Sequence, residues 1–266
     1  MSSIAPDTSK FPVLGDSSAA PPPPKFTLRP LRFSDIPTLA AQTANAYNGN
    51  PVNHFLAPRL ELYPGDHIRT FRQSIWRRAA NVRTLNLVGC LASDPDTPIG
   101  YCQHIRLGDN EGAQRQIRSS GISNRCFLFI LSWIIWALFR AENWLWPDRS
   151  CDKDAHKVFE KSITSDTKLH WTDRPERENR WHANTIVVDP KWQGKGIGRL
   201  LLQECLNRAQ EERVIVGLSA SPAGEKLYRK MGFQLLGDFT FRVGGDVGGG
   251  IMIWYPDGME ETNKSK

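Results

Sequence analysis

The stretch that decides the fold is Val187-Val-Asp-Pro-Lys-Trp-Gln-Gly-Lys-Gly-Ile-Gly-Arg-Leu-Leu-Leu202. The apolar, β-branched run that leads into it, residues 185–188, predicts a buried strand, and Asp189-Pro190 ends that strand. A loop with three glycines follows, and from Ile197 onward apolar residues return at helical spacing. The order of elements is therefore strand, glycine-rich turn and helix N-terminus.

This order of elements suits a diphosphate group. The first turn of a helix has unpaired N–H donors and carries the positive end of the helix dipole. Glycines let the backbone approach an anion without a Cβ in the way, and Lys195 adds a mobile positive charge. Two phosphate-binding motifs do not fit. The dinucleotide fingerprint G-x-G-x-x-G lacks its third glycine in register, and the P-loop lacks the Ser or Thr that should follow Lys195.

The pattern that remains is Gln193-x-x-Gly196-x-Gly198. It resembles the pyrophosphate-binding signature (Q/R-x-x-G-x-G/A) of the GNAT superfamily, the acetyl-CoA-dependent N-acyltransferases. A short glycine motif by itself also fits an ordinary turn that opens a helix. A second motif at the right distance is therefore needed to choose between these interpretations.

The second motif is Ser221-Pro-Ala-Gly-Glu-Lys-Leu-Tyr-Arg-Lys-Met-Gly-Phe233. Ser221 is a good N-cap, Pro222 suits the first helical position, and Gly232 can end the helix, so a helix over 222–231 is predicted. The block ends in L-Y-x-K-x-G-F and resembles the second conserved block of the GNAT family. With both blocks in order, the chain is identified as a member of the GNAT superfamily, with clear resemblance over 183–233.

The resemblance implies a fold class of α/β (α+β), the GNAT fold. Its central sheet is mixed and mostly antiparallel, is flanked by helices, and here has a helical insertion before the CoA-binding strand. The expected organisation is a Pro-rich disordered tail over 1–24, the acetyltransferase domain over 25–258 and a polar tail over 259–266. The insertion covers about 108–180, where the chain departs from a minimal GNAT domain.

Periodicity predicts the remaining elements of the domain. Ser34-Asp35 is expected to cap a helix that runs to about Tyr47, with Pro37 in its first turn. Strands are predicted over 26–31, 84–92, 98–107, 213–220, 234–243 and 250–255, and a second helix over 67–80. The residues 93–97 between two of these strands are expected to form a turn-rich linker, and the glycine-rich residues 244–250 a flexible loop.

The resemblance also implies the chemistry: acetyl-CoA is the co-substrate, and its acetyl group passes directly to a primary amine without a metal. Val187 or Val188 would offer a backbone N–H to the oxyanion. Tyr228, at the family's usual position, would contact the cofactor and protonate the leaving thiolate. The expected cofactor-binding residues are Ile186, Val187, Val188, Gln193, Gly194, Lys195, Gly196, Ile197, Gly198 and Tyr228.

The general base is less evident, because no Asp or Glu lies between Trp181 and Val188, where many relatives carry a carboxylate. His182 stands at that place, and an imidazole titrates in a useful range. In a regular strand His182, Asn184 and Ile186 would share one face. The alternative is a structural histidine with water as the base, and His104 is a weaker candidate for the same role.

Composition limits the other partners. The formal net charge of +6 is scattered along the chain, which predicts no nucleic-acid partner and suits an anionic cofactor. Five widely spaced cysteines without a C-x-x-C pair indicate reduced thiols in an intracellular protein. The expected compartment is the cytoplasm, with the nucleus as a further option.

An apolar run, residues 126–139, stands out inside the insertion. It is apolar all round, but Arg140 and Glu142 end it before the roughly 20 residues that a membrane span needs. Three interpretations stay open: a buried or lid helix, which is favoured, an interfacial helix anchored by its tryptophans, and a true span. Membrane contact would then involve Phe127 to Trp146.

Two functions from different classes fit these observations. The leading one is an N-acetyltransferase that uses acetyl-CoA, with either a small molecule or a protein as the amine acceptor. The alternative is a non-catalytic acyl-CoA-binding or sensor module that keeps the glycine loop. The missing strand carboxylate favours the alternative, and the retained Tyr228 favours the enzyme.

Overall fold

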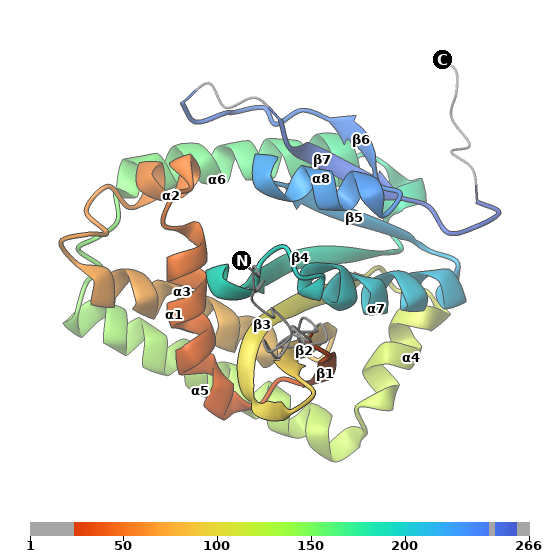
Figure 1. Cartoon of the computed structure of the whole chain (residues 1–266), viewed down its shortest axis with the longest axis horizontal. Helices are drawn as coiled ribbons and strands as arrows, with labels where there is room; N and C mark the ends of the chain where they lie inside the picture. Colours follow the sequence, from red (N-terminus) through yellow and green to blue (C-terminus); the bar gives the residue numbers. More distant parts are fainter. Residues whose placement is uncertain (1–23, 245–247, 260–266) are drawn as a thin grey trace, which may run out of the picture.

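The computed structural model describes residues 24–244 and 248–259, arranged around one seven-stranded sheet (Figure 1). The spatial order is β1-β2-β3-β4-β5-β7-β6, and every neighbouring pair is antiparallel except β4 and β5. This confirms the predicted mixed, mostly antiparallel sheet. The strands are β1 Phe26–Pro30, β2 Thr84–Leu91, β3 Asp94–Leu107, β4 Arg180–Val188, β5 Ile215–Ala220, β6 Gln234–Gly237 and β7 Gly250–Trp254.

Helices cover both faces of the sheet (Figure 1). Apolar side chains of α1 and α3 pack on one face of β2, β3 and β4, and those of α7 pack on the other. The helices are α1 Ile36–Tyr47, α2 Pro51–Leu56, α3 Pro64–Ala79, α4 Glu111–Ser119, α5 Ile122–Leu145, α6 Lys153–Thr167, α7 Ile197–Glu212 and α8 Pro222–Lys230. Shorter turns are η1 Phe33–Asp35, the π-helix η2 Lys168–Thr172, η3 Pro175–Arg177 and η4 Pro190–Trp192.

The predicted elements differ from the observed ones mainly at their ends. The Asp35 carboxylate does not cap α1, because it accepts two hydrogen bonds from Arg29 at 2.7 and 2.9 Å. Helix α3 begins at Pro64, earlier than predicted, and α2 was not predicted. Residues 94–97, expected as linker, belong to β3. The tail 1–23, the centre of the glycine-rich loop (245–247) and residues 260–266 lie outside the described residues.

A β-bulge at Asn184 divides β4 into two parts. Ala183 pairs with His104 and Thr185 with the neighbouring Gln103, so Asn184 has no partner on β3. The extra residue reverses the side-chain alternation along the strand. Ile186 therefore packs toward α7, whereas His182 packs against the Trp171 ring of η2. The expectation that these two residues share one face is wrong for this reason.

Strands β4 and β5 separate soon after they meet. They pair over only three positions, from Arg180–Ile215 to His182–Gly217. Beyond His182 the rest of β4 pairs only with β3, so its other edge has no strand partner among the described residues. The sheet therefore opens between β4 and β5 toward the end of β4 that leads into the glycine loop.

Polar contacts fix the far end of α7 to the base of this opening. The buried Arg106 guanidinium of β3 donates to the Glu212 carboxylate of α7 at 2.7 Å. The other Glu212 oxygen accepts from the Trp181 indole of β4 at 3.1 Å. A buried ion pair of this kind has little freedom to rearrange, since breaking it would leave an unpaired charge in the core. It therefore holds α7 in register with β4.

The second half of the insertion covers the face of β5, β6 and β7 that faces away from α8. The Trp171 ring lies so close to Gly217 of β5 that a side chain there would collide with it. His170 occupies the corresponding space over Gly237 of β6. The π-helix η2 thus completes the core of the C-terminal strands, where Trp171 packs with Ile215, Ile251 and Ile253.

Helix α5, which contains the apolar run, lies along the lower edge of the molecule in Figure 1, outside α3. It is long and apolar enough to cross a membrane, and only 11% of its most apolar 18 residues are buried. Ile135 and Phe139 are its buried apolar residues. The favoured prediction was a buried or lid helix. Burial is wrong for most of α5, because α3 offers it only one narrow stripe of contact, and the lid role stays a prediction.

Candidate functional site

The glycine loop forms a bend whose backbone donors are free. Gly194 and Gly196 have φ of 75° and 94°, in the left-handed region that glycine adopts without strain. No described residue accepts a hydrogen bond from the N–H groups of residues 194–198, and α7 begins at Ile197. These N–H groups sit at the positive end of the α7 dipole, so they form a ready site for an anion.

The Gln193 side chain fixes the shape of this loop, and Lys195 lies beside it. The Gln193 amide donates to the Val188 carbonyl at 3.0 Å, which closes the loop onto the end of β4. Gln193 is among the expected cofactor-binding residues, but its backbone N–H donates to the Pro190 carbonyl at 3.4 Å and is not free for an anion. The Lys195 ammonium lies 4.3 Å from the centre of the Trp192 ring, beside the loop and able to swing over it.

The free edge of β4 continues this site toward the interior. The Asp189 N–H donates to the Ile99 carbonyl of β3 at 2.9 Å. Since peptide groups alternate along a strand, the Val187 N–H also points to β3, and the N–H groups of Ile186 and Val188 point into the opening. Of the two backbone donors predicted for an oxyanion, Val188 is therefore the one that faces the opening.

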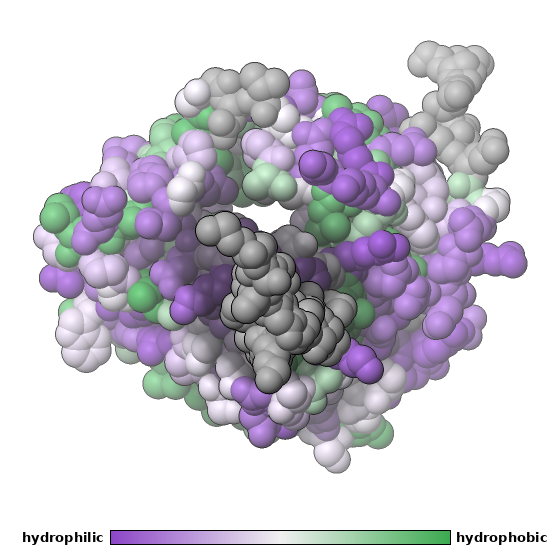
Figure 2. Space-filling view, in the orientation of Figure 1, coloured by the Kyte–Doolittle hydropathy of each residue, from purple (hydrophilic) through white to green (hydrophobic). Residues whose placement is uncertain are grey.

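The opening between the strands leads to a hollow at the centre of the molecule. Figure 2 shows this hollow between α1, α8 and the end of β4, as located in Figure 1. Tyr228 of α8 is half-buried, with its ring 5.8 Å from that of Phe233. Burial raises the pKa of the Tyr228 phenol to about 12, and the nearby Tyr47 hydroxyl adds to this. The phenol thus stays protonated throughout the neutral range.

A group of residues that sequence reasoning missed lies where α1 and α3 pack on β3. The Tyr101 hydroxyl is hydrogen-bonded to Thr43 at 2.9 Å, and Tyr47 ends α1. Arg78 of α3 lies near both phenols, is half-buried, and forms no ion pair or hydrogen bond with a described side chain. Burial lowers the pKa of its guanidinium. No sequence signal links these residues, because only the packing of α1 and α3 on β3 brings them together.

His182 lies at the vertex where β4 and β5 part. Its ring centre is 6.0 Å from that of Trp171, and its Nδ1 is buried without a described partner. Burial, with Arg180 and His104 nearby, lowers the pKa of His182 to about 4. The imidazole is therefore neutral at pH 7 but a weak base. His104 is fully buried, and its Nε2 donates to the Leu201 carbonyl at 3.3 Å, which gives it a structural position.

His104 makes the stability of the fold depend on pH. Burial lowers its pKa to about 4 from an ordinary value of 6.5, so the unfolded chain binds more protons between these values. We expect full stability above pH 6.5 and a loss of about 3 kcal/mol from this group as pH falls to 4.

Urea unfolding of His104→Gln across this range should show a free energy of unfolding that falls less steeply with decreasing pH than that of wild type. The exposed α6 residue gives a control, His156→Gln, which should keep the wild-type slope. Equal slopes for all three proteins would contradict the assignment.

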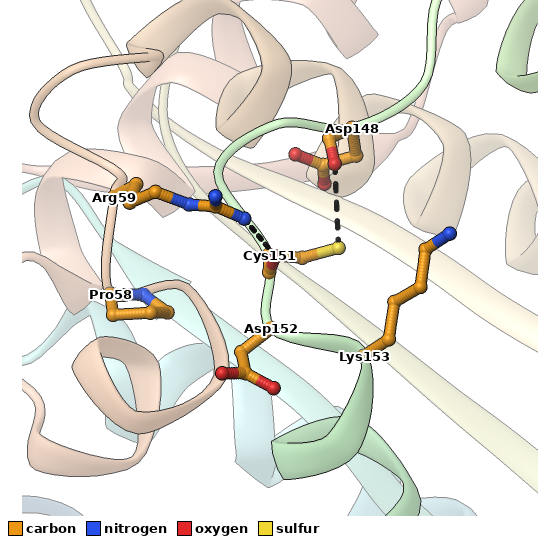
Figure 3. A pocket seen from close by; sticks show the side chains of 6 residues that line it. All are labelled: Pro58, Arg59, Asp148, Cys151, Asp152 and Lys153. Atoms are coloured by element: carbon orange, nitrogen blue, oxygen red, sulfur yellow. Dashed lines mark hydrogen bonds between the residues drawn. The ribbon is translucent and has the colours of Figure 1, made fainter.

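A second depression on the surface is separate from this site. Figure 3 shows that it lies where the loop after α2 meets the connection between α5 and α6. Arg59 donates to the Cys151 carbonyl at 2.9 Å, and the Cys151 thiol donates to the Asp148 carbonyl at 3.6 Å. Burial raises the pKa of the Cys151 thiol, which disfavours a nucleophilic role. None of the residues that line this depression is a predicted site residue; they are Pro58, Arg59, Asp148, Cys151, Asp152 and Lys153.

Comparison with known proteins matches one part of the chain to a family model. Residues 166–235, which contain both sequence blocks, match the family model described as the acetyltransferase (GNAT) domain. The N-alpha-acetyltransferase RimI of Mycobacterium tuberculosis is 43% identical over 58 residues, which are 21% of this chain and 37% of RimI. The chain thus spans little more than a third of the length of that curated relative.

One solved structure shares the fold over most of the chain. A structure from Corynebacterium glutamicum, described as histone acetyltransferase HPA2 and related acetyltransferase, has a TM-score of 0.52. The match is 16% identical and covers 88% of this chain and 98% of that one. PH1933 from Pyrococcus horikoshii covers similar shares, 88% and 99%, at 17% identity and a TM-score of 0.48. At such identities the likeness concerns the fold alone.

Proposed function

The chain carries a GNAT acetyltransferase domain and has the GNAT fold, and on this premise we propose that it is an acetyl-CoA-dependent N-acetyltransferase. The proposed reaction is direct transfer of the acetyl group to a primary amine. The observation that carries the proposal is the parting of β4 and β5 next to a loop with free backbone N–H groups. This arrangement offers an anion site for a diphosphate and an interior channel for an extended thioester arm.

Each part of the cofactor can be assigned to residues of this chain that would bind it. The N–H groups of residues 194–198 and the Lys195 ammonium would bind the pyrophosphate. The free edge of β4 would hold the pantetheine arm as an added strand, through the backbone of Ile186. The Val188 N–H would then stabilise the negative oxygen that forms when the amine attacks the thioester carbonyl.

Two proton transfers complete the reaction. As the carbon–nitrogen bond forms and the carbon–sulfur bond breaks, the thiolate of CoA takes the proton of the Tyr228 phenol, and the tyrosinate then regains a proton from the water that has accepted the one lost by the nitrogen. The attacking nitrogen must lose a proton, and the low pKa of His182 makes its imidazole a poor acceptor for it. We therefore assign this proton to water in the hollow and give His182 a structural role at the vertex.

Arg78 indicates the chemical class of the acceptor. A half-buried guanidinium without a described partner attracts an anion strongly, because little water screens it. An acceptor that carries a carboxylate near its amine would satisfy Arg78, whereas a simple monoamine would place its ammonium against a like charge. We propose that the acceptor is an amine with a carboxylate within reach of Arg78.

The test is release of free CoA thiol by the purified chain with acetyl-CoA and a panel of amines. We expect turnover, with amino acids and acidic dipeptides better than monoamines of equal length. Arg78→Met should raise KM for the carboxylate-bearing amines about tenfold and leave monoamines unchanged. Binding of acetyl-CoA without turnover on any amine would favour the non-catalytic sensor, and equal KM values in Arg78→Met would contradict the acceptor class alone.

A further inference from the structure

Helix α5 presents an apolar surface that the rest of the chain leaves uncovered. Among its side chains Trp133 is 59% exposed, Phe129 65% and Trp144 80%. Figure 1 places the helix on the outside of the molecule, and apolar residues reach the surface along that edge in Figure 2. The exposed set is Ile122, Phe127, Phe129, Ile130, Trp133, Ile134, Trp136, Leu138, Trp144 and Leu145, followed by Trp146. A continuous surface of this kind marks a binding site.

Firm contacts hold α5 against the domain along one stripe. Ile135 and Phe139 pack with Ala80 at the end of α3. Near the C-terminal end of α5, Glu142 forms an ion pair with Arg72 of α3 and accepts a hydrogen bond from Gln73 at 2.8 Å. These polar contacts fix α5 alongside α3, so its exposed face has a defined direction.

Two arginines lie beside aromatic rings of α5. The Arg140 guanidinium lies 5.9 Å from the centre of the Trp136 ring, and Arg77 of α3 lies 5.6 Å from that of Phe139. A shallow depression is lined by both arginines together with Trp136 and Trp144. Tryptophan and arginine are the residues that favour the boundary between lipid tails and headgroups, because each has an apolar body and a polar tip.

Basic residues predominate among the charges around α5, although Arg115 is paired with Glu111 at 3.6 Å. Residues 112–147 contain four arginines, Arg115, Arg118, Arg125 and Arg140, and a single acidic residue. That residue is Glu142, which is already paired with Arg72. A second copy of this surface would meet the same positive charge, whereas the anionic lipids of a bilayer would attract it.

We propose that α5 is an interfacial helix that docks the domain on an anionic lipid bilayer, lying in the plane of the membrane. The 24 residues of α5 would extend about 36 Å, enough to span a hydrocarbon core of about 30 Å. A span would nevertheless have to break the contacts of Glu142, Ile135 and Phe139 with α3. Docking in the plane keeps all of them and buries the exposed apolar face.

The test is flotation of the purified full chain with vesicles of phosphatidylcholine, alone or mixed with phosphatidylserine. We expect flotation that is stronger with phosphatidylserine and weaker at high salt. The double variant Ile130→Glu with Trp133→Glu should lower the vesicle-bound fraction about tenfold or more, since it puts two negative charges on the face that would enter the membrane. The matched control, Leu62→Glu with Leu169→Glu, changes two exposed leucines outside α5 and should bind as wild type does.

Depth of insertion separates docking from a span. A nitroxide at Ile134→Cys, in a background of Cys126→Ser and Cys151→Ser, should lie about 5–10 Å below the headgroups. A label near the bilayer centre would overturn the in-plane arrangement. A wild-type chain that does not float with the vesicles would overturn membrane docking. Light scattering that shows such a chain to be a dimer would assign the apolar face to a second copy instead. Neither outcome depends on acetyl-CoA, so the proposed activity is tested separately.

Discussion

Replacing Gly196 with Glu is expected to weaken acetyl-CoA binding by at least about 100-fold, which is about 2.7 kcal/mol. The new carboxylate would stand at the mouth of the anion site, beside the free N–H groups of residues 194–198. Nothing lies within 4 Å of the position that a Cβ would take, so the side chain meets no steric obstacle. Its negative charge would instead repel the pyrophosphate. Calorimetric titration with acetyl-CoA measures the change directly.

The control for this prediction is Gly196→Lys. Gly196 has φ of 94°, so any side chain there adds a backbone strain of about 1–2 kcal/mol. The Glu and Lys variants share that strain and differ in the sign of the charge. We expect Gly196→Lys to bind acetyl-CoA within about tenfold of wild type. If both variants lose binding equally, strain explains the loss, and if Gly196→Glu binds normally, the loop does not hold the cofactor.

Tyr228→Phe is expected to lower kcat by about 10²–10³-fold and to leave the Kd for acetyl-CoA unchanged. The substitution removes only the hydroxyl and keeps the ring contact with Phe233, so the fold of α8 is preserved. A matched control is Tyr63→Phe, because Tyr63 packs under Arg149 away from the hollow and should be neutral. Normal turnover by Tyr228→Phe would remove the phenol from the reaction.

The pH dependence gives a second check on Tyr228. An acid is active only while protonated, and the Tyr228 phenol has its pKa raised to about 12 by burial. Activity due to this group is therefore lost only as pH rises toward 12. We expect kcat to show no decline from this source between pH 8 and about 10. A wild-type decline centred near 9 that disappears in Tyr228→Phe would contradict the raised pKa.

The sequence determined the local parts of the site. The loop over 193–198 and the helix after Ser221 were predicted from glycine placement, capping and spacing, and these signals act within a few residues. Ser221 accepts from the Gly224 N–H at 3.2 Å, and Gly232 has φ of 89°, as the predicted cap and helix end require. Local rules sufficed because each of these structures is stabilised by its own backbone.

Tertiary structure decided the strand register, the position of Arg78 and the exposure of α5, because each of these depends on residues far apart in the chain. The bulge at Asn184 follows from the pairing of β4 with β3, and it separated His182 from Ile186. Arg78 came close to Tyr47 and Tyr101 only through the packing of α3 on the sheet. The apolar run of α5 had the composition of a buried helix, but exposure depends on the area that neighbours provide, and α3 covers only one stripe of it.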